Sequence, residues 1–73
     1  MNGIQLKECR KAKGMSQATL SRLLGVTQQA VGKWETGRSN PDPEMLVRLA
    51  EVLGTTTDYL LGLTEQKNHP NTE

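Results

Sequence analysis

Apolar residues recur at helical spacing along the first sixty positions, and no segment alternates with the period of two that a half-buried strand requires. Glycine and proline interrupt this pattern at short intervals. We expect helices over about residues 3–13, 17–24, 28–36, 43–53 and 57–61. The pattern therefore predicts an all-α fold, a compact bundle of five short helices.

Residues that cap helices precede four of these segments. Ser16, Thr27 and Thr56 carry hydroxyls that accept backbone N–H groups at a helix start, and Asp42 precedes a proline suited to the first helical position. Residues 1–63 are expected to form one domain, because 73 residues support a single core. Residues 64–73 contain no apolar side chain and are expected to form a disordered polar tail.

The join between the second and third predicted helices is the most informative feature. Gly25, Val26 and Thr27 form a turn of three residues, and Gly25 tolerates the positive φ that such a turn needs. Ser21 is small enough for the place where the two helices cross. Apolar residues that join the helices to each other and to the core stand at Leu20, Leu24, Val26, Val31 and Trp34. Residues 17–36 are therefore predicted to form a helix-turn-helix unit.

Charge is distributed unevenly along the chain, although the net charge is only +1. Residues 1–40 hold seven basic and two acidic side chains, whereas residues 41–73 hold two basic and six acidic ones. A chain polarised in this way can present a basic face to a polyanion such as DNA. Charges that are merely solvated are the alternative explanation.

Composition also excludes several classes of function. One cysteine and one histidine make neither an internal disulfide nor a structural zinc site, so we expect no metal and no cofactor. The chain has no Cys–His pair close in sequence and no glycine-rich phosphate loop before a strand. We therefore expect neither an enzyme nor a small-molecule ligand. No apolar run is long enough for a membrane span or a signal peptide, which makes the cytoplasm the default compartment.

With these motifs in place, the chain resembles the lambdoid phage repressor and Cro group, the XRE-type or lambda-repressor-like regulators. The similarity runs from about Leu6 to Leu63. It is carried by Gly14-Met15-Ser16-Gln17, Leu20, Leu24-Gly25-Val26, Lys33-Trp34-Glu35-Thr36-Gly37, Pro41, Leu49-Ala50, Leu53-Gly54 and Asp58-Tyr59-Leu60-Leu61-Gly62. The resemblance implies a recognition helix in the DNA major groove and a dimer on a near-palindromic operator.

The resemblance also implies which residues would contact double-stranded DNA. Base contacts are expected from Gln28, Gln29, Lys33 and Thr36, since a glutamine amide matches the donor and acceptor of adenine. Backbone contacts are expected from Gln17, Thr27, Arg38, Ser39 and Asn40. Gly32 leaves a gap in the recognition helix, which either permits a close approach to DNA or weakens local contacts.

The same resemblance implies a structural ion pair, and the apolar residues of the C-terminal region indicate a dimer surface. Arg10 and Glu35 are expected to form a structural ion pair. The candidate dimer interface consists of Tyr59, Leu60, Leu61 and Leu63, unless these residues only complete the core. The expected function is a sequence-specific transcriptional regulator, a repressor that acts as a homodimer. The alternative is an antitoxin or a protein-interaction module with the same fold.

Overall fold

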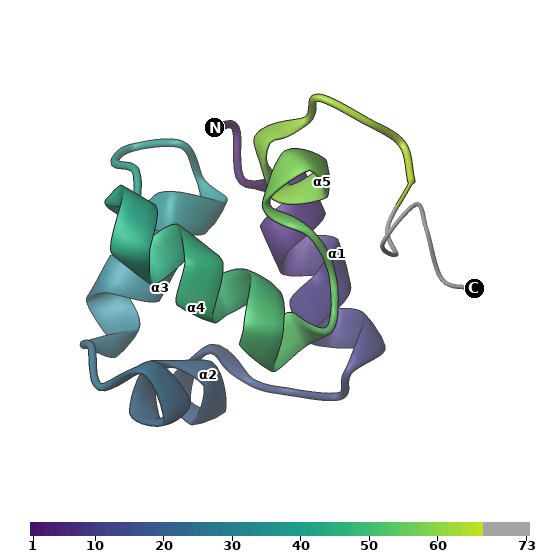
Figure 1. The fold of residues 1–73 in the computed structure, drawn as a ribbon. Helices are drawn as coiled ribbons and strands as arrows, with labels where there is room; N and C mark the ends of the chain where they lie inside the picture. Colours follow the sequence, from purple (N-terminus) through teal and green to yellow (C-terminus); the bar gives the residue numbers. More distant parts are fainter. Residues whose placement is uncertain (67–73) are drawn as a thin grey trace.

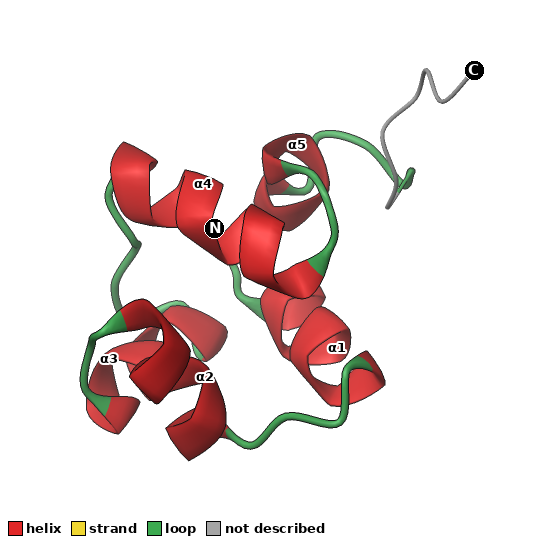
Figure 2. Ribbon diagram, turned by 60° about the horizontal axis from the view of Figure 1, so that its bottom comes forward, coloured by secondary structure: helices red, strands yellow, loops and turns green. Residues whose placement is uncertain are grey.

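Five helices account for most of residues 1–66, the part of the chain that the computed structural model describes. They are α1 (Ile4–Ala12), α2 (Gln17–Leu24), α3 (Gln28–Glu35), α4 (Pro43–Leu53) and α5 (Thr57–Leu61). The described residues contain no strand (Figure 2). The predicted all-α fold is confirmed. The predicted tail lies outside the described residues from position 67 onward, and residues 64–66 form neither helix nor strand.

Side-chain caps begin four of the helices, at the positions that the sequence predicts. In each case a side-chain oxygen accepts the backbone N–H three residues further along: Ser16 from Thr19, Thr27 from Ala30, Asp42 from Met45 and Thr56 from Tyr59. Each cap satisfies one of the N–H groups that the first turn of a helix leaves without a partner. The caps explain why the starts of α2 to α5 were predictable.

α1 is shorter than predicted because Gly3 is not helical. This glycine has a φ of 84°, caps the helix from the left-handed region and is buried. A Cβ at this position would overlap the carbonyl oxygens of Trp34 and Glu35. Gly3 therefore allows the start of α1 to abut the end of α3. α3 itself ends at Glu35, one residue earlier than expected, and Thr36 follows as its C-cap.

All five helices contribute side chains to one core. The six largest fully buried side chains are Leu6 of α1, Leu20 and Leu24 of α2, Val31 of α3, Leu49 of α4 and Leu60 of α5. In Figure 1, α4 crosses the front of the molecule, with α2 and α3 to one side and α1 and α5 to the other. The core thus fixes α3 against its neighbours while one face of α3 stays open to solvent.

Candidate nucleic-acid interface

The turn between α2 and α3 is built from local backbone hydrogen bonds. Gly25 adopts a φ of 74° and ends α2, and the N–H of Val26 donates to the carbonyl oxygen of Ser21 at 3.0 Å. Ser21 is buried, and its hydroxyl donates to the carbonyl oxygen of Ala18 at 2.7 Å. A small, internally satisfied side chain at this place lets α2 and α3 pack closely. The two helices form the predicted helix-turn-helix unit.

The outer face of α3 gathers most of the residues predicted to contact bases. Gln28, Gln29, Lys33 and Thr36 are all exposed. A shallow hollow of about 520 Å³ is lined by Gln29, Gly32, Lys33, Thr36 and Arg38. The structure therefore brings three of the four candidate base contacts together with one candidate backbone contact. Gln28 is exposed on α3 but does not line this hollow.

The hydroxyl of Thr36 donates its proton to backbone carbonyl oxygens of α3, which limits the contacts that it can make with DNA. The hydroxyl lies 3.1 Å from the carbonyl oxygen of Gly32 and 3.3 Å from that of Lys33, and it donates to this pair. Its proton is then not available to a base acceptor. Thr36 can offer its methyl group and the remaining acceptor capacity of its oxygen to the hollow.

Four of the five candidate backbone contacts lie at the two ends of α3, and the fifth, Gln17, begins α2. The Thr27 hydroxyl caps the helix by accepting from Ala30, which leaves its proton for an outside acceptor. Beyond the C-terminal end, the N–H of Arg38 donates to the carbonyl oxygen of Lys33 at 2.9 Å. Arg38 and Asn40 are exposed, whereas Ser39 is half-buried.

Asn40 has a partner within the chain that the sequence did not predict. Its side-chain oxygen accepts a hydrogen bond from the α-amino group of Met1 at 3.1 Å. This bond joins the first residue to the loop that follows α3. Asn40 remains exposed, so its NH₂ group can still donate a hydrogen bond to a group outside the chain.

Arg10 and Glu35 form a buried ion pair between α1 and α3. The Nε of Arg10 donates to one carboxylate oxygen of Glu35 at 2.5 Å, and a terminal nitrogen donates to the other at 3.1 Å. Arg10 also donates to the carbonyl oxygen of Met15 at 2.8 Å. The pair is bidentate, which fixes both side chains. Arg10 is thereby occupied inside the fold.

Gln17, the first residue of α2, joins the same network. Its Nε2 donates to Glu35 at 3.0 Å, so one carboxylate accepts three hydrogen bonds from two residues. Burial raises the pKa of Glu35, but the hydrogen bonds from Arg10 and Gln17, together with the positive charge of Arg10, outweigh burial and hold the pKa below its ordinary value. Glu35 is therefore ionised at neutral pH.

Sequence reasoning missed the bond between Gln17 and Glu35. It treated Gln17 only as a phosphate contact and Glu35 only as the partner of Arg10. The two residues are 18 positions apart, and their contact depends on how α2 crosses α3. No local pattern in the sequence reports that crossing angle, so the bond becomes visible only in the folded chain.

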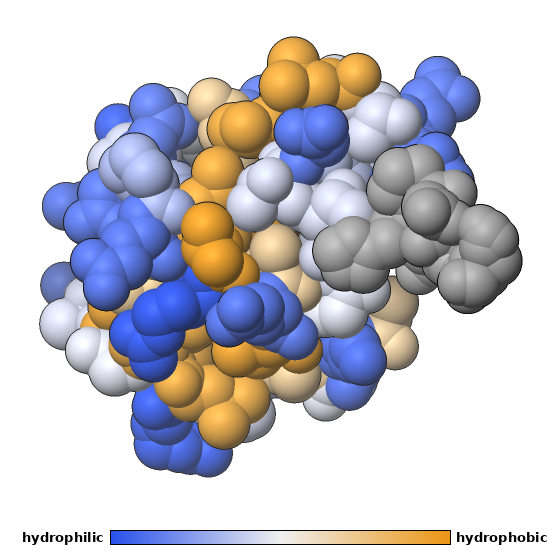
Figure 3. All heavy atoms as spheres, in the orientation of Figure 1, coloured by the Kyte–Doolittle hydropathy of each residue, from blue (hydrophilic) through white to orange (hydrophobic). Residues whose placement is uncertain are grey.

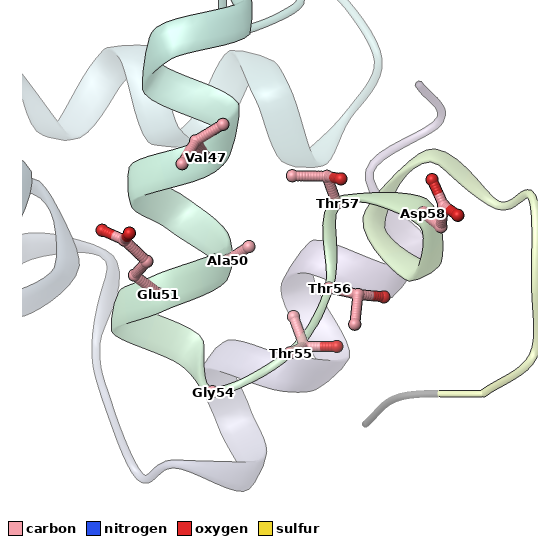
Figure 4. A pocket seen from close by; sticks show the side chains of 8 residues that line it. All are labelled: Val47, Ala50, Glu51, Gly54, Thr55, Thr56, Thr57 and Asp58. Carbon is pink, nitrogen blue, oxygen red and sulfur yellow. The ribbon is translucent and has the colours of Figure 1, made fainter. Parts of the chain in front are cut away.

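A second hollow, of about 540 Å³, lies away from the predicted DNA contacts. It is formed by α4 and the segment that leads into α5, and its lining includes Val47, Glu51, Thr57 and Asp58 (Figure 4). The two carboxylates on its lining disfavour contact with a phosphate backbone. Of the two hollows, the one on α3 is therefore the better candidate for nucleic acid.

The four candidate dimer residues separate into two groups. Tyr59 and Leu60 are buried and belong to the core, whereas Leu61 and Leu63 are 43% and 72% exposed. Apolar side chains also gather at the surface in a band that runs from α5 past α4 toward α2 (Figure 3). Of the four candidate dimer residues, Leu61 and Leu63 are therefore the two that expose apolar surface to a second copy.

Among residues 1–66, no helix combines the length and the apolar character needed to span a bilayer. The same residues contain no group of three or more potential metal ligands.

Comparison with known proteins agrees with this geometry. A family model described as helix-turn-helix (HTH_3) matches residues 6–60, inside the predicted domain. The chain is 46% identical over 61 residues to the SPbeta prophage-derived uncharacterized HTH-type transcriptional regulator YonR of Bacillus subtilis (strain 168), a match that covers 84% of this chain and 56% of that protein.

Two phage repressors are also similar. Identity is 34% over 59 residues to repressor protein C2 of Salmonella phage P22, covering 81% of this chain and 27% of that protein. Identity is 45% over 49 residues to the 26 kDa repressor protein of Escherichia phage HK022, covering 67% and 21%. The chain spans about half the length of the first curated relatives that it matches. No solved structure matches it significantly.

Proposed function

The chain belongs to the helix-turn-helix family of transcriptional regulators, and from this premise we propose that it is a sequence-specific DNA-binding repressor that acts as a dimer on a near-palindromic operator. Two of the similar proteins are named as phage repressors and one as a transcriptional activator, and the proposal of repression follows the two repressors. We also propose that the protein acts in the cytoplasm, because that is where operator DNA lies in bacteria, including those that phages infect.

The observation that carries the proposal is the composition of the open face of α3. Gln29 and Lys33 are exposed beside a hollow, and Gln28 is exposed in the first turn of the same helix. Helix-turn-helix proteins read bases with the N-terminal part of the second helix of the unit. Gln28 and Gln29 supply paired donors and acceptors for adenine, and Lys33 supplies a donor for guanine or phosphate.

Backbone contacts would hold α3 in register on the duplex. Gln17 begins α2, where backbone N–H groups and the helix dipole favour a phosphate. Thr27, Arg38, Ser39 and Asn40 flank α3 at its two ends and complete the proposed set. Such contacts position the protein without reading the sequence.

We propose that the dimer forms through the exposed Leu61 and Leu63, and dimers of this class bind half-sites about one helical turn apart. Replacing both leucines by serine should lower the mass measured by equilibrium sedimentation on operator DNA from two copies to one. Leu23→Ser is the matched control, because Leu23 is a comparably exposed leucine on α2. A double variant that still binds as two copies would place the dimer contact elsewhere.

Selection from a random duplex pool tests the function itself. Bound sequences should converge on a near-palindrome with two half-sites, and the selected DNA should bind at least a thousandfold more tightly than random DNA. Affinity should also fall linearly with the logarithm of salt concentration. A pool without enrichment would contradict sequence-specific binding and would favour a protein-interaction module.

A further inference from the structure

The carboxamide of Gln17 is held in one place by two residues of α3. Its Nε2 donates to Glu35 at 3.0 Å. A Cβ at Gly32 would lie 3.8 Å from its Oε1 and 3.9 Å from its Nε2, so the amide rests over the open position that this glycine leaves. Gln17 therefore reaches from the start of α2 onto the helix that would enter the major groove.

Glu35 decides which way this amide faces. A glutamine amide has a donor end and an acceptor end of nearly equal shape, so packing alone does not distinguish its two orientations. An ionised carboxylate only accepts hydrogen bonds, so it binds the NH₂ end of Gln17 and repels the carbonyl oxygen. The depressed pKa of Glu35 keeps the carboxylate ionised at neutral pH.

Arg10 makes this arrangement rigid and compatible with DNA. Its bidentate bond fixes the Glu35 carboxylate from the side of α1. Its positive charge also offsets a negative charge that would otherwise repel nearby phosphates. The orientation of a residue at the start of α2 is thus set by an ion pair in the interior.

We propose that Glu35 is a positioning residue for DNA binding: by accepting a hydrogen bond from Gln17, it keeps the second N–H of that amide available for a phosphate oxygen. This inference rests on the proposed DNA-binding function. With the opposite orientation, Gln17 would turn its carbonyl oxygen, an acceptor, toward a phosphate that offers only acceptors. Glu35 then contributes to DNA affinity without touching DNA.

A double-mutant cycle on DNA affinity tests the proposal. The dissociation constants of the full chain, Gln17→Ala, Glu35→Gln and the double variant are measured on random-sequence duplex and on selected operator. Each single variant should weaken binding by about tenfold, the usual worth of a hydrogen bond to a charged group. Because both changes remove the same contact, the double variant should bind within about twofold of Gln17→Ala.

Losses that multiply to about a hundredfold in the double variant would overturn the proposal, as would unchanged affinity in Gln17→Ala. The matched control combines Gln17→Ala with Arg38→Ala. No hydrogen bond joins these two residues, so the losses of DNA affinity from the two single substitutions should multiply in the double variant. Urea unfolding in the same buffer gives the folded fraction of each variant, and the dissociation constants are corrected for it. Coupling on random duplex without operator selectivity would support the inference and contradict the proposed function.

The wild-type chain provides a second readout that does not require the variants to fold. In a nuclear magnetic resonance titration, the side-chain NH₂ signals of Gln17 should shift with pH as the neighbouring Glu35 gains its proton, below the ordinary pKa of 4.5. The exposed Gln28 serves as the internal control and should not follow this titration. Gln17 signals that behave like those of Gln28 would contradict the proposal.

Discussion

At the scale of single residues, the buried pair of Arg10 and Glu35 connects stability with the candidate DNA surface. The Arg10 side chain is 9% exposed and that of Glu35 is 3% exposed. Removal of charged groups from water is costly, and the bidentate bond, with the hydrogen bonds that Arg10 donates to Met15 and Glu35 accepts from Gln17, offsets that cost. The pair holds α1 against α3, and it also fixes Gln17.

Replacing Arg10 should reveal this dependence. Arg10→Met leaves the Glu35 carboxylate buried without its partner, and we expect it to lower the free energy of unfolding by about 3–5 kcal/mol. Urea denaturation followed by circular dichroism measures the change. Lys11→Met is the control, since Lys11 is an exposed neighbour, and it should change stability by less than about 0.5 kcal/mol. Equal effects of the two substitutions would show that the pair does not stabilise the fold.

The pH dependence of stability has a defined sign. The pKa of Glu35 is lower in the folded chain than its ordinary value of 4.5, so the unfolded chain takes up the proton first as pH falls. The contribution of ionised Glu35 is therefore complete at neutral pH and is lost as pH falls below 4.5 through the folded pKa. The stability difference between wild type and Glu35→Gln should be larger at pH 7 than near pH 3. A difference that does not change with pH would contradict this account.

At the scale of elements, α3 carries a glycine that its fold does not require. Gly32 lies in mid-helix with φ outside the positive range, and the nearest atoms to an added Cβ are those of Gln17 at ordinary contact distance. Gly25 differs, because its φ of 74° is needed for the turn between α2 and α3. Two glycines seven residues apart thus have different physical reasons to be there.

Alanine substitutions at these two positions should act in opposite directions. Gly32→Ala should raise the free energy of unfolding by up to about 1 kcal/mol, because alanine loses less backbone entropy in a helix. An alanine methyl group at position 25 would also meet open space, but the backbone there is left-handed. Gly25→Ala should therefore lower the free energy of unfolding by about 1–2 kcal/mol. Thermal and urea unfolding measure both. Destabilisation by Gly32→Ala would mean that the open position over Gln17 is needed for folding.

The elements also show how far sequence reasoning reaches. Helix starts at Ser16, Thr27, Asp42 and Thr56 were predictable because a cap is a local interaction between residues three positions apart. The exact ends of α1 and α3 were not, since Gly3 adopts a φ of 84° where the start of α1 abuts the end of α3, a contact between segments far apart in the sequence.

Burial of the apolar residues of α2 and α3 was predictable from their spacing, but the polar contacts between helices were predictable only through resemblance to a family, or not at all. The pairing of Arg10 with Glu35 came from that resemblance, whereas the bond from Gln17 to Glu35 was missed. Tyr59 and Leu60 fit a core and a dimer surface equally well in the sequence. Their burial against the other helices depends on the angle at which α5 packs, which the local pattern does not contain.

At the scale of the whole molecule, the open face of α3 and the uneven charge point to the same use. The first forty residues, which include α1 to α3, carry most of the basic side chains, and the acidic side chains concentrate in the later part of the chain. DNA approaching the open face of α3 would meet the exposed charges of Lys33 and Arg38 together with Gln28 and Gln29. We propose that Gln28, Gln29 and Lys33 read the bases of the operator.

The most direct measurement compares binding to operator and to random duplex for wild type and for a variant with Gln28, Gln29 and Lys33 replaced by alanine. The variant should stay folded, because all three side chains are exposed, and it should lose at least a hundredfold in preference for the operator. Weak, salt-sensitive binding to random duplex should remain. The control, Glu44→Ala, changes an exposed side chain in the first turn of α4 and should keep full preference. A triple variant that still prefers the operator as strongly as wild type would contradict the account.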